Sequence, residues 1–348
     1  MTTQSPTSNG ATAPLRGAAA RIAEVQSGLA ARGAQHIGDL VSWNAEGIDV
    51  PRDKGLAVFE AAGMGVHWPA IEPGTALYRG VQNVRPPRPK KDAPGPRLDT
   101  RAFARPNPDT PVAYGVYQVD PRDGESGDRY TCGARVRVDP NSKVVVAMAP
   151  EDEPAIDEAL ALANRIADEA NHLIRFAESR DVTNAMVGVI KVLCGVPFRT
   201  RGGVYLVPPS KCGVWRAMLP GLRELGVDPI TVDMYDSPLA TVAAATSAKS
   251  ALEADIAALR DELKKAVTEG MKKAPLQRRL VACDELSARV DLYRGVLMDT
   301  ADELLAEAAR VREGLARELD SAGGDSSRLG GTDEDAGGAS LFDLKVIG

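Results

Sequence analysis

The residues that most often bind metals or act as nucleophiles are few and scattered along this chain. The three histidines and four cysteines lie in separate segments without CxxC spacing: His36, His67, His172, Cys132, Cys194, Cys212 and Cys283. The sequence also contains no HExxH, GxSxG or Gly-Lys-Ser/Thr motif, the patterns that place such groups on a catalytic or phosphate-binding scaffold. We therefore predict no catalytic residue, no metal and no cofactor.

A glycine-rich turn is the first candidate for contact with an anion or a partner. In VPFRTRGGVYLVPP, residues 196–209, apolar runs on either side of the turn predict a β-hairpin. Glycine tolerates positive φ and leaves neighbouring amides accessible. The contact residues would be Arg199, Arg201, Gly202 and Gly203. The alternative is a plain hairpin whose arginines are solvated.

A basic, proline-rich stretch is the candidate for contact with nucleic acid. Residues 85–111 contain eight of the 24 prolines, and proline at this density predicts an extended spacer. Its cationic side chains could neutralise phosphates. They are Arg85, Arg88, Lys90, Lys91, Arg97, Arg101 and Arg105. Phe103 is the sole aromatic residue among them, so a solvated linker between domains is the alternative.

Two long helical runs near the C-terminus carry the most regular pattern. In residues 238–273 and 275–319, apolar residues recur at alternating steps of three and four, which lines up one seam of a helix. A break at Gly270 and Pro275 predicts an antiparallel hairpin over residues 237–320. At 1.5 Å per residue the helices would be roughly 54 and 67 Å long. The longer second helix would leave an overhang without an internal partner, at Val311, Leu315 and Leu319.

The other segments complete a predicted domain order. Residues 1–14 have a disordered composition, and residues 15–84 predict a small helical module. After the linker, strands over 112–120, 129–139 and 143–149 predict an antiparallel meander. Helices and a last strand extend this α+β domain to residue 236. The predicted fold class is therefore α+β, with a helical module before the sheet domain and a helical hairpin after it.

The C-terminal tail combines a polar spacer with an apolar tip. Residues 321–348 are rich in Gly, Ser and Asp until Leu341, Phe342 and Leu344. This is the general form of a tethered docking peptide. The alternative is a tip that packs back onto the body or adds an edge strand.

Composition narrows the class of protein. The 348 residues are 44% hydrophobic and 26% charged, with a net charge of −6, as in a globular protein. No apolar run reaches the ~18 residues of a membrane span, and the N-terminus lacks the apolar core of a signal peptide. We expect a cytoplasmic protein with reduced cysteines and no membrane contact.

The order of several short motifs resembles a known family. DLVSW (39–43), AVFEAAG (57–63), TALYRGV (75–81) and the GGVYLVP hairpin (202–208) precede a helical C-terminus. This order is similar to an uncharacterised family of bacterial and phage-related proteins, over most of residues 37–320. The resemblance implies the domain order, and no activity.

These observations lead to three hypotheses for function. The first is a non-enzymatic interaction or scaffold protein that binds a protein partner or itself through a C-terminal coiled coil and the C-terminal tip. The second is a nucleic-acid-binding protein that uses the 85–105 strap with Arg199 and Arg201. The third is an enzyme of unknown reaction with a site in the α+β domain.

Overall fold

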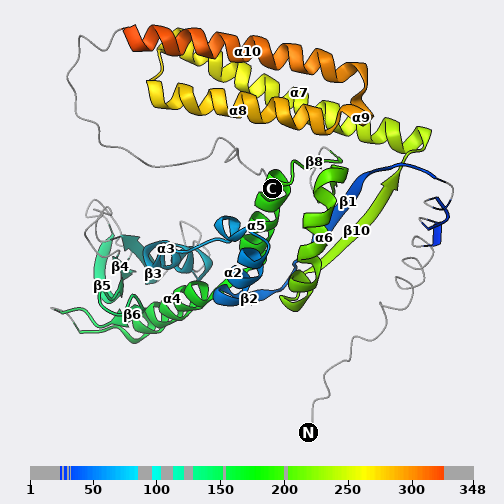
Figure 1. Ribbon diagram of the computed structural model, residues 1–348. Coiled ribbons are helices and arrows are strands. Elements are labelled where there is room, and N and C mark those ends of the chain that lie inside the picture. The colour runs from blue at the N-terminus through cyan, green and yellow to red at the C-terminus, as the bar shows by residue number, and fades with distance from the viewer. Residues whose placement is uncertain are drawn as a thin grey trace. The chain divides into compact units, whose positions relative to one another are not determined.

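The computed structural model has two compact units that confirm the α+β class (Figure 1). It describes residues 24–25, 27–29, 31, 33–84, 96–102, 113–120, 128–151, 154–199 and 203–324. The first unit comprises Met1–Asn44, Val189–Leu219 and Asp228–Gly348, and the second comprises Ala45–Gly188 and Pro220–Val227. In the sequence, the second unit is thus inserted between segments of the first.

The first unit contains a four-stranded antiparallel sheet of order β10-β1-β9-β8. Its strands are β10 (Asp228–Tyr235), β1 (His36–Asn44), β9 (Tyr205–Val207) and β8 (Val196–Pro197). Helix α6 (Pro209–Glu224) is fixed to this sheet where Trp215 Nε1 donates to Thr231 Oγ1 at 2.8 Å. The predicted helical module over 15–84 is therefore wrong at β1, a nine-residue strand, because its partner β10 lies too far along the chain for local patterns to reveal.

The helical part of the first unit is a bundle of three long helices, where the sequence predicts a hairpin. The helices are α7 (Pro238–Glu269), α8 (Lys273–Leu292), the short α9 (Arg294–Leu297) and α10 (Asp299–Gly324). The Ser237 side chain accepts from the Ala240 amide and Pro238 opens α7, as expected. The chain then turns at Met298, whose φ is 51°, and α10 returns along α7 and α8 (Figure 1).

Close packing between α7 and α10 depends on a small residue. A Cβ atom at Gly314 would lie 2.5 Å from the Leu263 side chain, so glycine permits this approach of the two helices. The bundle core is one continuous apolar cluster that runs from Ala244 to Leu315 and includes Ile37, Leu206 and Met234 of the sheet. The apolar seam of the long helices is therefore covered by other residues of the same chain.

The second unit contains another four-stranded antiparallel sheet, of order β3-β4-β5-β6. Its strands are β3 (Arg97–Ala102), β4 (Ala113–Asp120), β5 (Arg129–Val138) and β6 (Val145–Met148). The last three are the predicted meander. The predicted linker over 85–111 is wrong at β3, which pairs with β4 over six residues, because the prolines flank this strand without interrupting it.

Helices cover one face of this second sheet. An apolar cluster joins β4, β5 and β6 to α3 (Pro73–Val84) and α4 (Asp157–Arg175). The remaining elements are a two-stranded ribbon of β2 (Asp49–Pro51) and β7 (Phe176–Glu178), with α2 (Arg52–Ala61), η1 (Gly65–His67) and α5 (Ser179–Val192). The division between the two units falls within α5 and α6.

Candidate functional site

The face of the β3-β4-β5-β6 sheet that points away from α3 and α4 carries arginines and tyrosines. Val116, Ala134 and Val136 belong to the apolar cluster under the helices. Since side chains alternate along a strand, their neighbours Tyr117, Arg135 and Arg137 lie on the opposite face. The strand register places the other members on this same face. We call the set the arginine–tyrosine face: Arg97, Arg101, Tyr117, Tyr130, Arg135 and Arg137.

A β-bulge brings Tyr130 onto this face. Val116 pairs with Ala134, whereas Tyr117 pairs with Cys132, so Gly133 is the extra residue. A Cβ atom at Gly133 would lie 2.6 Å from Ala159 Cβ and 2.8 Å from Ile156 Cβ. Glycine therefore lets α4 lie close at the point where the alternation of β5 reverses.

The aromatic rings and one arginine of this face form a connected group. The Tyr117 and Tyr130 ring centroids are 6.5 Å apart with the rings nearly perpendicular. The Arg101 Cζ atom lies 3.7 Å from the Tyr130 ring centroid, a cation–π arrangement. Tyr130 is 39% exposed. The group thus places two aromatic rings and a cation side by side on the face of the sheet that points away from α3 and α4.

Three of the four arginines of the face are held by weak, accessible ion pairs. Arg97 pairs with Asp128 at 2.7 Å, Arg101 with Asp99 at 3.4 Å, and Arg135 with Glu151 at 3.6 Å. All three pairs are in contact with solvent, and pairs of this kind contribute about 0–1 kcal/mol each. An incoming phosphate could therefore replace a carboxylate at little cost.

The structure brings together two of the seven predicted nucleic-acid residues, Arg97 and Arg101. Five lie outside the described residues: Arg85, Arg88, Lys90, Lys91 and Arg105. Sequence reasoning missed Tyr117, Tyr130, Arg135 and Arg137. Alternation along the predicted strands could have found Tyr117 with Arg135 and Arg137, but the bulge at Gly133 hides the position of Tyr130.

The predicted hairpin with Arg199 is present in the first unit. Val196 pairs with Leu206, and the Phe198 amide donates to the Val204 carbonyl at 2.9 Å. Arg199 is exposed, and Gly203 has a φ of 84°, so glycine serves the turn as expected. Arg201 and Gly202 lie outside the described residues.

The predicted interaction surface at the end of the second helical run is wrong. Val311 and Leu315 are 5% and 0% exposed, and Leu319 packs against the same core. They face α7 and α8 because the run turns back at Met298. The other interaction candidates, Leu341, Phe342 and Leu344, lie outside the described residues.

A polar cluster surrounds the buried carboxylate of Asp39, between β1 and α6 in the first unit. Arg216 donates to both oxygens of Asp39, at 2.9 and 2.7 Å, and to Asp233 at 2.7 Å. His36 Nε2 lies 2.8 Å from Asp39 Oδ1. Although Asp39, His36 and Cys212 have metal-like spacing, within 4.8 Å of one another, the guanidinium already neutralises the carboxylate. Burial raises the pKa of the Cys212 thiol to about 12, and Asp39 adds to this, so the thiolate needed for metal binding or nucleophilic attack is disfavoured.

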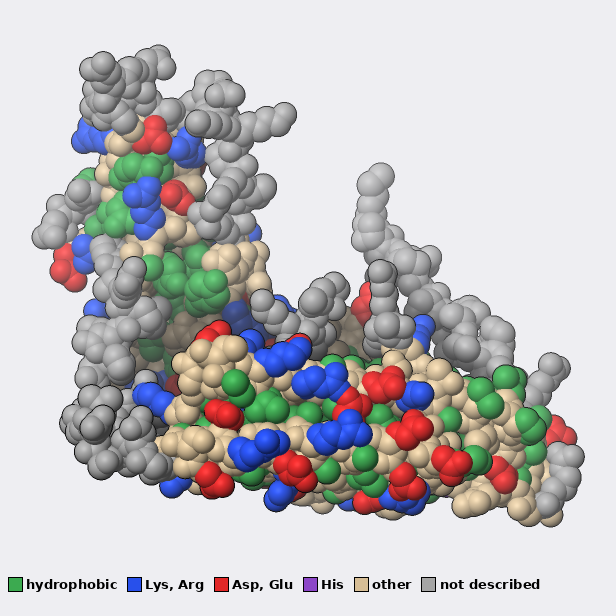
Figure 2. Space-filling view, turned by 90° about the horizontal axis from the view of Figure 1, so that it is seen from above, with side chains coloured by type: hydrophobic (Ala, Val, Ile, Leu, Met, Phe, Trp, Pro, Cys, Tyr) green, Lys and Arg blue, Asp and Glu red, His purple; other side chains and the backbone are tan. Residues whose placement is uncertain are grey.

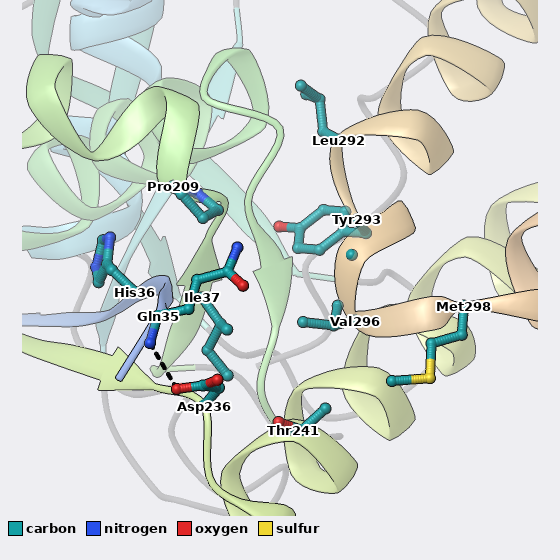
Figure 3. A pocket seen from close by; sticks show the side chains of 11 residues that line it. Gln35, His36, Ile37, Pro209, Asp236, Thr241, Leu292, Tyr293, Val296 and Met298 are labelled. Carbon is teal, nitrogen blue, oxygen red and sulfur yellow. Dashed lines mark hydrogen bonds between the residues drawn. The ribbon is translucent and has the colours of Figure 1, made fainter. Parts of the chain in front are cut away.

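A pocket of about 250 Å³ lies next to this cluster (Figure 3). The Tyr293 hydroxyl is 2.9 and 2.8 Å from the Cys194 and Leu206 carbonyl oxygens, which share its single proton. Burial raises the pKa of this phenol. In Figure 3 the His36 ring points away from Tyr293. The pocket is smaller than the ~300–1,000 Å³ usual for ligand sites, and its polar groups do not point to a common centre.

Among the described residues, no helix combines the length and apolar character needed to cross a bilayer. Comparison with known proteins finds no match among curated proteins and none among solved structures. A family model does match, over residues 36–322. Because this match covers most of the chain, the protein belongs to a family of unknown function, DUF6744.

Proposed function

We propose that this protein binds single-stranded nucleic acid through the arginine–tyrosine face. The observation that carries the proposal is the placement of Arg101 over Tyr130, with Tyr117 beside it, on the sheet face that points away from the helices. Proteins that bind single strands combine aromatic rings, on which bases stack, with cations that follow the backbone. The arginine–tyrosine face has both components, and the unpaired bases of a single strand are accessible for stacking.

The sequence around β3 supports the same proposal. The other basic residues of the 85–105 strap come shortly before and after β3 in the sequence, so the chain tethers them near the arginine–tyrosine face. The net charge of −6 makes long-range attraction of a polyanion weak. We therefore expect moderate affinity that depends strongly on salt. Because the four cysteines lie in separate segments without CxxC spacing, we expect a reducing compartment, the cytoplasm of a bacterium or of a phage-infected cell.

The surface of the helical bundle gives less support to the scaffold hypothesis. Figure 2 shows basic and acidic side chains intermixed along the bundle, with hydrophobic side chains scattered among them. Charged residues on α7 pair locally, as Lys264 does with Asp261 and Lys249 with Glu253. Because α10 covers the apolar seam of α7 and α8, the C-terminal tip is the remaining candidate for binding a protein partner.

The test is fluorescence anisotropy with labelled ~20-nucleotide DNA and RNA single strands and the matching duplex, at about 50 mM salt. We expect the single strands to bind more tightly than the duplex. The slope of log affinity against log salt should be about −3 if four arginines neutralise phosphates, at ~0.7 per contact. Tight duplex binding with no preference for single strands would contradict the stacking role.

Variants separate this face from general charge effects. Tyr117→Leu with Tyr130→Leu removes the stacking surface and should weaken binding by ~1–3 kcal/mol per lost stack. Arg97→Gln with Arg101→Gln should reduce the salt slope. Lys264→Gln with Lys265→Gln removes the same charge from exposed positions on α7 and should leave binding unchanged. Equal losses in all three variants would refute the assignment to this face.

A further inference from the structure

The outer edge of β10 in the first unit has no strand beside it among the described residues. β10 pairs with β1 on one side only and stands last in the order β10-β1-β9-β8. Ile230 on this strand is 51% exposed. An open edge of eight residues presents unpaired amides and carbonyls that can template another strand, and proteins usually cover or block such edges.

The two faces of β10 differ in character. Met234 belongs to the core of the first unit, so by alternation Ile230 and Val232 lie on that same face. Asp233 lies on the other face, where it accepts from Arg216. A strand that fits this edge therefore needs apolar side chains at alternate positions and a cation, rather than an anion, opposite Asp233.

The chain itself contains such a segment. In Phe342-Asp-Leu-Lys-Val346 the alternate residues Phe342, Leu344 and Val346 are apolar, while Asp343 and Lys345 lie between them. We propose that residues 342–347 pair with the free edge of β10 as an added antiparallel strand of the same chain.

The length of the chain permits residues 342–347 to return to β10. α10 begins after Met298, which lines the same pocket as Asp236 at the end of β10. Its 26 residues carry the chain ~39 Å away at 1.5 Å each. The 15 residues from 325 to 339 can span ~50 Å. The tip can therefore reach the Tyr235 end of β10, and a strand that runs from there toward Asp228 is antiparallel to β10.

Charge selects the register. With Lys345 opposite Asp233, Leu344 lies opposite Met234 and Val346 opposite Val232. A shift by two residues would place Asp343 opposite Asp233, and like charges directly opposite each other are destabilising. In the favoured register Phe342 lies opposite Asp236, a residue of the pocket wall, so its ring is placed at the mouth of the pocket.

Cross-linking in the full-length chain tests the pairing. In a background with Cys132→Ser and Cys194→Ser, the pair Val232→Cys and Val346→Cys should form an intramolecular disulfide under mild oxidation. The matched pair Val232→Cys and Lys345→Cys points to opposite faces and should cross-link at least tenfold more slowly. Equal rates for the two pairs would overturn the register, and dimers without intramolecular product would assign the tip to a second copy and overturn the proposal.

Hydrogen exchange provides a second measurement without a covalent trap. Leu344→Asp with Val346→Asp should accelerate exchange of the outward β10 amides at least tenfold, while the interior of α7 stays unchanged. Leu341→Asp, on the other face of the tip, should have no such effect. Unchanged β10 exchange in the Leu344→Asp/Val346→Asp variant would refute the added strand.

Discussion

The two four-stranded antiparallel sheets of this protein use arginine in opposite ways. The β10-β1-β9-β8 sheet holds a fully buried carboxylate, Asp39, which Arg216 neutralises from α6. The β3-β4-β5-β6 sheet has a mostly apolar face under its helices and carries its arginines on the other face. An arginine is therefore structural where its partner carboxylate is buried, and available to a ligand where its partner is solvated.

The largest predicted effect comes from removing the cation that neutralises Asp39. Arg216→Met removes the guanidinium from the buried Asp39 carboxylate and leaves only the His36 ring beside it, and loss of one partner of a buried pair costs up to ~3–5 kcal/mol. Urea denaturation of the full chain would measure this change. Trp43 and Trp215 lie in the first unit and Trp68 in the second, so tryptophan fluorescence in a Trp68→Phe background reports on the first unit.

The matched substitution on the other sheet is Arg101→Met. Its pair with Asp99 is solvent-exposed, so we expect a loss of at most ~1 kcal/mol, measured by circular dichroism. Similar losses for Arg216→Met and Arg101→Met would remove the distinction between the sheets.

The second prediction concerns packing under the β3-β4-β5-β6 sheet. Gly133→Ala places a methyl group 2.6 Å from Ala159 Cβ, and overpacking of this kind typically costs ~1–3 kcal/mol. Gly213→Ala in α6 is the control, because its Cβ would meet nothing within 4 Å and alanine favours a helix by ~0.5–1 kcal/mol. A Gly133→Ala protein as stable as the parent would show that the bulge tolerates a side chain.

The third prediction concerns Cys212 on α6, which packs in the first unit. We expect this residue to lower the stability of the protein at alkaline pH. Burial raises the pKa of Cys212 from its ordinary value of 9 to about 12. Between these values the unfolded chain releases the proton and the folded chain keeps it, so stability falls as pH rises. The loss is ~1.4 kcal/mol per pH unit. Thermal melts at pH 8, 9 and 10 should show a shallower decline for Cys212→Ala than for the parent, and parallel declines would exclude Cys212 as a source.

The smallest predicted effect is at the rim of the arginine–tyrosine face. Arg137 is exposed on β5, so Arg137→Gln should change stability by no more than ~0.5 kcal/mol. It should nevertheless reduce the salt slope of single-strand binding by ~0.7. A stable variant with an unchanged slope would remove Arg137 from the arginine–tyrosine face's contacts.

Local sequence signals predicted where helices and strands occur better than they predicted which of them pack or pair with one another. The Ser237-Pro238 start of α7 and the three strands β4, β5 and β6 are local features, and capping and turn residues identify them. The turn at Met298 has no such signal, because apolar spacing continues across it from Val290 to Leu304. The reversal that fills the seam depends on packing of α10 against two earlier helices, which periodicity does not encode.

The candidate site was predictable only in part for a related reason. Arg97 and Arg101 are conspicuous as basic residues in the sequence, whereas Tyr117 and Tyr130 acquire their meaning from strand register. That register includes a bulge at Gly133, whose cause is the approach of α4 from a later part of the chain. Information of this kind resides in tertiary contacts.

The insertion of one unit within the other also sets an order of events during synthesis. β1 and its partner β10 are separated by the 183 residues from Ala45 to Val227. At ~5–20 residues per second, β1 leaves the ribosome roughly 10–40 s before β10 exists. The inserted unit is almost entirely available for folding during that interval, while β1 waits with Ile37 and Val41 uncovered. A chaperone that shields the nascent N-terminal segment would therefore act on β1 first.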